Sequence, residues 1–198
     1  MLVVVETHPV QYHAPVWASA AARGVPLHVV YGATFSVDGH RDPEFHAPVQ
    51  WDRSLLDGYS HEVLPPGPNG PARNYETVSS NGLTAALNRL RPDALLCCGY
   101  SHRLDRRTVI EGWRRKLPLL LRAEANDSAR QRSPFKAFGR DLLLSNLYRT
   151  MAGVLSIGHE ATAHYRRLGV PAHKIFASPY AVATTPFQTT EQDHQLLR

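Results

Sequence analysis

The chain has 198 residues, of which 43% are hydrophobic and 20% charged; these values fit one globular domain, or one domain with an appendage, and exclude disorder over most of the length. Its net charge of +5 comes mostly from arginine. A basic charge of this kind is typical of proteins that bind phosphates, anionic lipid or nucleic acid, and also of a solvated surface rich in arginine. The sequence contains no RNP, zinc-finger or helix-turn-helix pattern, so we expect no nucleic-acid partner.

Short apolar runs and helical patterns alternate along the whole chain. We expect strands at residues 2–5, 27–31, 61–64, 94–98, 118–121, 154–157 and 175–177. We expect helices from about residue 14 to Gly24 and over 79–90, 104–116, 135–149 and 159–168. Alternation of this kind favours an α/β fold with a parallel sheet covered on both faces. Because crossovers are right-handed, the prediction is a doubly wound, mostly parallel sheet of six to seven strands in the order 3-2-1-4-5-6.

The domain organisation that we expect is a single domain over residues 1–187, with a linker or tail at 188–198. Residues 33–60 form an irregular insertion, which is long for a structureless connection and therefore favours a function. Trp51, Asp52 and Tyr59 lie in this insertion. Their aromatic rings either stack on sugar faces or attach the insertion to the core.

No targeting or membrane-spanning segment is expected. The apolar run at residues 2–5 is far too short for a signal peptide, and no stretch approaches the ~18 apolar residues of a transmembrane helix. Cys97 and Cys98 are neighbours on an expected strand, point to opposite faces and are poorly placed for a disulfide. We expect a cytoplasmic protein. A band of basic residues either contacts the inner face of the membrane peripherally or forms a solvated surface. The band consists of Arg130, Arg132, Lys136 and Arg140.

Polar side chains crowd the connection between the first strand and the first helix. In a doubly wound sheet, ligands bind at the carboxyl edge of the strands, where this connection lies. The connection contains no Gly-x-Gly, so we expect side-chain recognition of a hydroxyl-rich ligand; the alternative is a loop that binds its own backbone. The candidate binding residues here are Thr7, His8, Gln11, Tyr12 and His13.

The connections after the fourth and fifth strands meet the same edge. Tyr100, Ser101 and His102 follow the fourth strand, and His102 is either a general acid/base or hydroxyl ligand, or a helix cap. Arg122 and Glu124 follow the fifth strand, where they either converge on a ligand or form a salt bridge with each other.

Several common catalytic patterns are absent from the sequence. There is no G-x-G-x-x-G after a strand, no G-x-x-x-x-G-K-[ST] and no G-x-S-x-G. His159 and His164 are five residues apart and differ by about 140° around a helix, so they do not form a zinc-binding pair. We therefore expect no metal site.

Four segments resemble the amino-terminal domain of the family 4 glycosyltransferases. They read HPVQYHAPVW, FHAPVQWDRSLLDGY, PDALLCCGY and PLLLRAE. A fifth segment, VLSIGHEATAHYRRLGVPAHKIFASPYAV, is similar to the end of that domain. The resemblance implies the amino-terminal half of a GT-B fold, in which two Rossmann-like domains face each other across a cleft.

The resemblance also implies a function. The chain would be the acceptor-side domain of a retaining enzyme that transfers a sugar to a saccharide or glycolipid without a bound metal. No cofactor would bind here, since the nucleotide-sugar would bind a carboxy-terminal domain beyond Arg198. The isolated chain would then be inactive. The alternatives are a stand-alone glycan-binding or partner-activating module, and half of a nucleotide-sugar epimerase. The residues assigned to catalysis are Glu124, Arg122 and His102. Those assigned to the acceptor are Thr7, His8, Gln11, Tyr12, His13, Trp51, Asp52, Tyr59, Tyr100 and Ser101.

Overall fold

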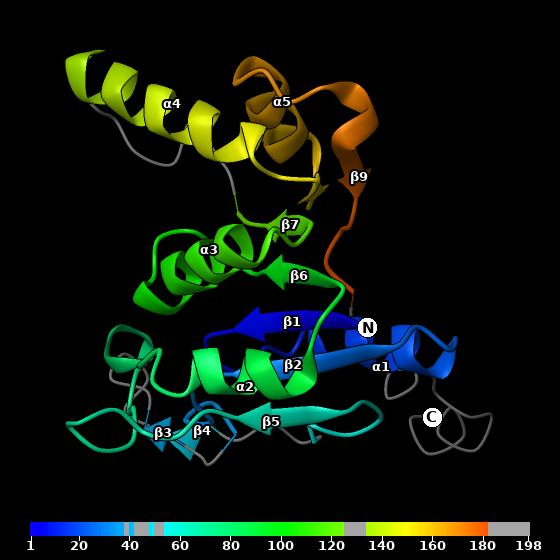
Figure 1. The fold of residues 1–198 in the computed structure, drawn as a ribbon, viewed down its shortest axis with the longest axis vertical. Coiled ribbons are helices and arrows are strands. Elements are labelled where there is room, and N and C mark those ends of the chain that lie inside the picture. Colours follow the sequence, from blue (N-terminus) through cyan, green and yellow to red (C-terminus); the bar gives the residue numbers. More distant parts are fainter. Residues whose placement is uncertain (38–39, 42–47, 50–53, 125–133, 182–198) are drawn as a thin grey trace, which may run out of the picture.

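The structure is a computed structural model that describes residues 1–37, 40–41, 48–49, 54–124 and 134–181. Seven parallel strands form one sheet in the order β5-β2-β1-β6-β7-β8-β9 (Figure 1). This is the order 3-2-1-4-5-6-7, so the predicted doubly wound α/β class is confirmed. The strands are β1 (Leu2–Glu6), β2 (Leu27–Tyr31), β5 (His61–Val63), β6 (Ala94–Cys97), β7 (Leu119–Arg122), β8 (Gly153–Ser156) and β9 (Ile175–Ala177). A separate antiparallel pair joins β3 (His40–Arg41) to β4 (Pro48–Val49).

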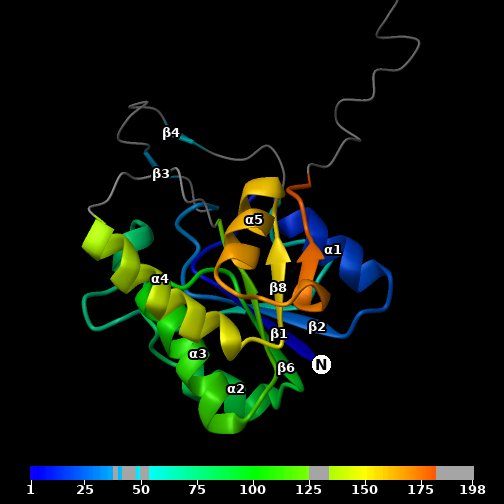
Figure 2. The same cartoon turned by 90° about the horizontal axis from the view of Figure 1, so that it is seen from above.

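The helices cover the two faces of the sheet unequally. Figure 2 shows α1 on one side and α2, α3 and α4 on the other. On the α1 side, Trp17 packs with Tyr31, Leu55 and Tyr59. The larger core lies on the opposite side. The helices are α1 (Ala14–Ala22), α2 (Leu83–Leu90), α3 (Arg103–Arg115), α4 (Pro134–Arg149) and α5 (His159–Arg167), with the 3-10 turns η1 (Tyr75–Thr77) and η2 (Ala172–Lys174).

The central strands are aliphatic runs because both of their faces are covered. Val3, Val4 and Val5 of β1 are almost completely buried, as are Leu95 and Leu96 of β6. Such continuous hydrophobic runs are typical of parallel strands between two layers. The register pairs Val5 with Cys97, so β1 and β6 end side by side and their connections begin at the same edge.

One expectation about local structure is wrong, and one alternative for the insertion is decided. The helix expected over 79–90 begins only at Leu83, because Gly82 has a φ of +78° and a left-handed residue cannot continue the helix. Part of the insertion at 33–60 packs onto the α1 face, where Leu55 and Tyr59 are buried. For Tyr59 this is the second of the two predicted alternatives, attachment of the insertion to the core. Trp51 and Asp52 lie outside the described residues.

Helix α4 exposes several large apolar side chains to solvent. Phe135 is 88% exposed and Phe138 69%, and Leu142 and Leu143 are also exposed. The inner side of the helix is buried through Leu144 and Tyr148. In the part of the chain that the structure describes, we find no helix with both the length and the apolar character needed to cross a membrane.

Candidate functional site

A cavity of about 320 Å³ opens at the carboxyl edge of the sheet. Its walls come from the connections that follow β1, β6, β7 and β8 and from the segment after β9, which is where the strand order predicts a binding crevice. Its volume lies within the range of small-molecule sites. The lining residues are Thr7, His8, Val10, Tyr12, His13, Tyr75, Cys98, Gly99, Tyr100, Ser101, Asp105, Arg122, Ala123, Glu124, Ile157 and Tyr180.

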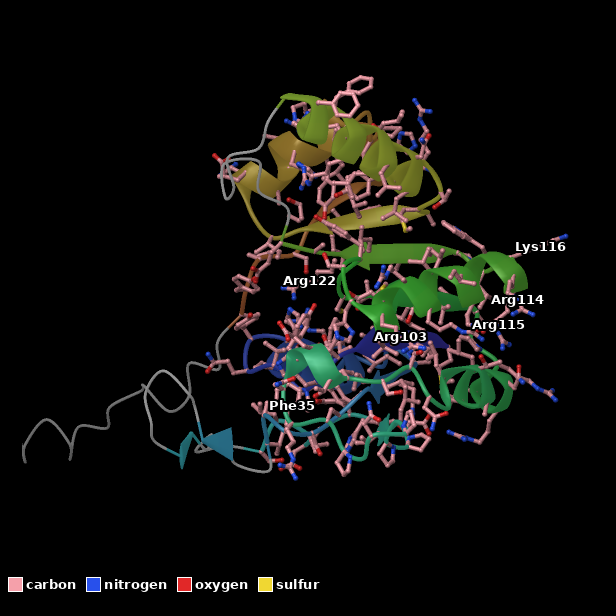
Figure 3. All side chains as sticks on the ribbon, turned by 90° about the vertical axis from the view of Figure 1, so that its left-hand side faces the viewer. Phe35, Arg103, Arg114, Arg115, Lys116 and Arg122 are labelled. Atoms are coloured by element: carbon pink, nitrogen blue, oxygen red, sulfur yellow. The ribbon has the colours of Figure 1, made fainter. Side chains whose placement is uncertain are left out.

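The connection after β1 is held in place by its own side chains and by Phe35. The Thr7 Oγ1 and His8 Nδ1 atoms lie 2.9 Å apart in a hydrogen bond. The His8 ring centroid lies 4.6 Å from that of Phe35 and 6.2 Å from that of Tyr75. Ser36 Oγ donates to the carbonyl of Pro9 at 2.8 Å. These contacts position the His8 ring at the cavity before any ligand binds, and Figure 3 labels Phe35 at this edge.

The connection after β6 is a tight turn into α3. Gly99 has a φ of +142°, and a Cβ there would lie 2.5 Å from Asp105 Oδ2, so the turn requires glycine. The backbone N–H of His102 donates to Asp105 Oδ2 at 3.0 Å. The N–H of Leu104 donates to His102 Nδ1 at 3.3 Å. These bonds form a capping box at the start of α3.

Arg122 and Glu124, at the end of β7, both contact the segment that follows β9. Arg122 is 2% exposed, and its Nη2 donates to the carbonyls of Ser178 and Pro179 at 3.3 and 3.4 Å. Its guanidinium carbon lies 5.4 Å from the Tyr180 ring centroid. The hydroxyl of Tyr180 donates to Glu124. Figure 3 shows Arg122 at this edge, with Arg114, Arg115 and Lys116 at the far end of α3.

Tyr180 connects this segment to the first wall of the cavity. Its ring centroid lies 4.1 Å from that of Tyr12 and 6.4 Å from that of His13. Three connections that are far apart in the sequence therefore meet around one aromatic ring. A face built from such rings can pack against the C–H side of a sugar.

Burial controls the ionisation of the cavity groups. The pKa of Tyr12 is raised first by burial and then by the nearby Glu124 carboxylate. Burial, and secondarily Asp105, raises the pKa of Tyr75, so both phenols are neutral donors at pH 7. Burial also raises the pKa of Asp105 to about 6. The cavity therefore offers neutral phenol hydroxyls beside the Glu124 side chain and the Arg122 guanidinium.

Most of the predicted site residues come together at the cavity. Those that line it are Thr7, His8, Tyr12, His13, Tyr100, Ser101, Arg122 and Glu124. Their roles towards a ligand stay predictions.

Three of the other predicted residues lie elsewhere, and two are not described. Gln11 is exposed and outside the lining. His102 is buried as a helix cap, which is the second of its two predicted roles, so it is not part of the cavity wall. Tyr59 hydrogen-bonds Tyr31 through the two hydroxyls at 2.7 Å and belongs to the core. Trp51 and Asp52 lie outside the described residues.

The sequence interpretation missed Tyr180, Tyr75 and Asp105. Tyr180 follows the last strand, so the rule that located Arg122 applies to it equally. Asp105 is three residues after the cap residue His102, a spacing typical of a capping box. Tyr75 lies in a long Pro- and Gly-rich connection, and nothing local in the sequence indicates that it returns to this edge.

Comparison with known proteins supports the fold. No protein-family model and no curated protein sequence matches the chain. The chain is similar to Anabaena Alr3699/HepE solved with UDP and glucose, with a TM-score of 0.58 and 13% identity over 100% of this chain and 49% of that one. The complex of the same protein with UDP-glucose gives a TM-score of 0.56 and 12% identity, over 100% and 48% of the two chains.

A likeness at this identity establishes the fold alone. A putative UDP-N-acetylglucosamine 2-epimerase from Listeria monocytogenes is also similar, at a TM-score of 0.49 and 11% identity over 89% of this chain and 44% of that one. That score is too low to support an argument. The chain spans about half the length of the solved structures that it matches. It has the Rossmann-like fold of one half of a GT-B protein.

Proposed function

We propose that this chain is the acceptor-binding half of a retaining glycosyltransferase that moves a sugar from a nucleotide-sugar to a saccharide or glycolipid. The observation that carries the proposal is the cavity, where Arg122 and Glu124 lie beside the aromatic rings of Tyr12 and Tyr180. Charged groups make strong hydrogen bonds to hydroxyls, and aromatic faces add apolar contact with a sugar ring. A saccharide can use both kinds of contact, because it has hydroxyl groups and an apolar ring face.

In this proposal the cavity orients the acceptor and does little covalent chemistry. Glu124 accepts a hydrogen bond from an acceptor hydroxyl. Holding the two reactants in a fixed geometry supplies much of the rate enhancement in such reactions. The Glu124 carboxylate is opposite in charge to the oxocarbenium-like transition state, and the Arg122 cation is opposite in charge to the departing phosphate. A second domain would hold the nucleotide-sugar. HepE has been solved with UDP-glucose, which is therefore the first donor to try.

The test uses the protein that carries this chain together with a second domain. His8→Ala and Glu124→Ala each remove one hydrogen-bonding partner of the acceptor, a loss of about 1–3 kcal/mol. We expect kcat/KM to fall about 5- to 150-fold while the affinity for the nucleotide stays unchanged. Glu160→Ala removes an exposed carboxylate of α5 outside the cavity and should leave both values at the wild-type level.

Five results would contradict the proposal. Wild-type kcat/KM in both cavity variants would place the acceptor elsewhere, and loss of nucleotide affinity would make this face the donor site. Turnover of a nucleotide-sugar by the 198-residue chain alone would show that no second domain is needed. Saccharide binding in a protein that has both domains but never transfers a sugar would favour a glycan-binding module. Conversion of the nucleotide-sugar to its epimer would favour an epimerase.

We further propose that the acceptor is presented at a membrane, through the outer surface of α3 and α4. This surface carries a groove of about 470 Å³ lined by Ile110, Trp113 and Leu143 among others. Nearer the start of α4, Phe135 and Phe138 are also exposed. The exposed Arg106 of α3 lies in the groove wall. An apolar surface with a cation at its border is typical of contact with anionic lipid.

Vesicle binding tests this surface. The chain should sediment with vesicles of phosphatidylcholine and phosphatidylglycerol, and less well at high salt or with phosphatidylcholine alone. Burying a phenylalanine contributes about 1.5–3 kcal/mol, so the double variant Phe135→Ser/Phe138→Ser should bind at least about tenfold more weakly. Phe176→Ser, on β9, removes a ring that is 53% exposed and lies outside this surface, and it is the control. Equal binding by all three proteins would contradict the proposal.

A further inference from the structure

One group of side chains at the cavity offers the ligand atoms of a metal site. Glu6, His13 and Cys98 each offer a metal-ligand atom, and within the described residues these three atoms all lie within 4.8 Å of one another. His13 and Cys98 line the cavity, and Glu6 lies beneath it at 2% exposure. We propose that these three residues bind a zinc-type divalent cation at the floor of the cavity.

The backbone brings the three residues together without any movement of the fold. Glu6 is the last residue of β1, and Cys98 follows the last residue of β6. The two strands are paired up to Val5 and Cys97, so Glu6 and Cys98 are the next neighbours in register. His13 stands immediately before α1, where the N–H of Trp17 donates to its carbonyl at 3.1 Å. The group is therefore held on three rigid elements.

The carboxylate of Glu6 is only partly satisfied. Its Oε1 accepts hydrogen bonds from His13 Nδ1 at 2.8 Å and from Trp17 Nε1 at 3.2 Å. Its Oε2 is buried and has no hydrogen-bond partner among the described residues. A buried polar atom left in this state costs about 1–3 kcal/mol. A cation bound at Oε2 removes that cost, and the Trp17 N–H then orients the carboxylate from behind, as outer partners of metal ligands do.

The donor set selects the metal. One sulfur, one ring nitrogen and one carboxylate oxygen are ligands that zinc accepts, whereas calcium and magnesium require oxygen. Thiolate and carboxylate together balance the two charges of the cation, as a partly buried site needs. Three protein ligands leave a fourth position, which here faces the cavity. That position is open to water or to a hydroxyl of a bound ligand.

Metal binding moves a proton. The thiol of Cys98 loses its proton to solvent as the sulfur–metal bond forms. Burial raises the pKa of this thiol, with Glu6 as the second cause, so the proton is bound at neutral pH when no metal is present.

The experiment measures metal directly on the chain without an affinity tag. The protein is treated with a chelator, dialysed against Zn²⁺ and analysed for bound metal; one equivalent is expected. With Co²⁺ in place of zinc, a charge-transfer band in the near ultraviolet reports a sulfur–metal bond. Cys98→Ser should remove the band and weaken Zn²⁺ binding by at least about tenfold, and Glu6→Gln should weaken Zn²⁺ binding with the band retained.

Cys97→Ser is the matched control, because Cys97 is the adjacent thiol and lies in the opposite core. It should keep both the bound metal and the band. Circular dichroism of each variant checks that it is folded. A wild-type chain that binds no zinc, or binds it equally well after Cys98→Ser, would overturn the proposal. Neither readout involves sugar or turnover, so this site and the proposed function stand or fall separately.

Discussion

Replacing Arg122 with methionine is expected to remove saccharide binding while changing the free energy of unfolding by no more than about 1 kcal/mol. The side chain is buried, and in the part of the chain that the structure describes its Nε and Nη1 groups have no hydrogen-bond partner. Each unpaired buried donor costs about 1–3 kcal/mol. Against this cost stand two long hydrogen bonds to Ser178 and Pro179 and a contact with Tyr180, each worth about 1 kcal/mol.

The cost of the unpaired donors and the gain from the contacts of Arg122 nearly cancel. Arg122 therefore adds little to the free energy of unfolding, and fold stability does not explain why a cation is buried at this position. Replacing buried charges with apolar side chains of similar volume is often neutral or stabilising. Saccharide binding at millimolar affinity corresponds to only about −4 kcal/mol, so losing one charged partner places it beyond detection.

Denaturant unfolding and a saccharide titration monitored by NMR measure the two effects on the same samples. Arg103→Met, at an exposed arginine outside the cavity, should change neither. If Arg122→Met lowers the free energy of unfolding by 3 kcal/mol or more, the side chain is a structural clamp for the 178–180 segment. Unchanged saccharide binding would remove Arg122 from the site.

Replacing Asp105 with asparagine is expected to stabilise the protein at pH 7 and to have little effect at pH 3. Burial raises the pKa of Asp105 from 3.8 to about 6 in the folded state. The folded protein then holds this proton more tightly than the unfolded chain, so the stability contributed by Asp105 falls as the pH rises from about 4 to 6. A shift of this size corresponds to about 3 kcal/mol. Asparagine does not ionise and can still accept the hydrogen bond from the His102 N–H.

Chemical denaturation at several pH values measures this effect as a difference between the wild type and the variant. The difference should grow between pH 4 and 6 and reach about 3 kcal/mol above pH 7. Glu76→Gln, at an exposed carboxylate in η1, should show no comparable rise. Parallel curves for wild type and Asp105→Asn would show that Asp105 ionises at its ordinary pKa in the folded state.

The architecture was predictable because its causes are local. Runs such as residues 2–5 and 94–98 are apolar throughout, and strands between two layers need that composition. Crossover handedness then restricts the strand order, and the observed order agrees with it. The same rule places Thr7, Tyr100 and Arg122 at one edge, because each follows a parallel strand. The sequence thus determined the fold class and the location of the cavity.

The tertiary structure decided which side chains line that cavity. Gln11 and Tyr12 are neighbours in the sequence, but only Tyr12 lies in the cavity wall. His102 follows a strand like Arg122, yet the start of α3 uses its ring as a cap. Nothing local distinguishes a capping ring from a binding one, because the choice depends on the path that the chain takes after the strand.

Residue patterns in the sequence do not predict contacts between residues that are far apart in the chain. Tyr180 meets Tyr12 and Glu124 only because β9 is the last strand of the sheet and its following segment crosses back over the carboxyl edge. Glu6, His13 and Cys98 converge because β1 and β6 are adjacent in register. Residue type and spacing describe one element at a time, whereas a site is made where the ends of several elements meet in space.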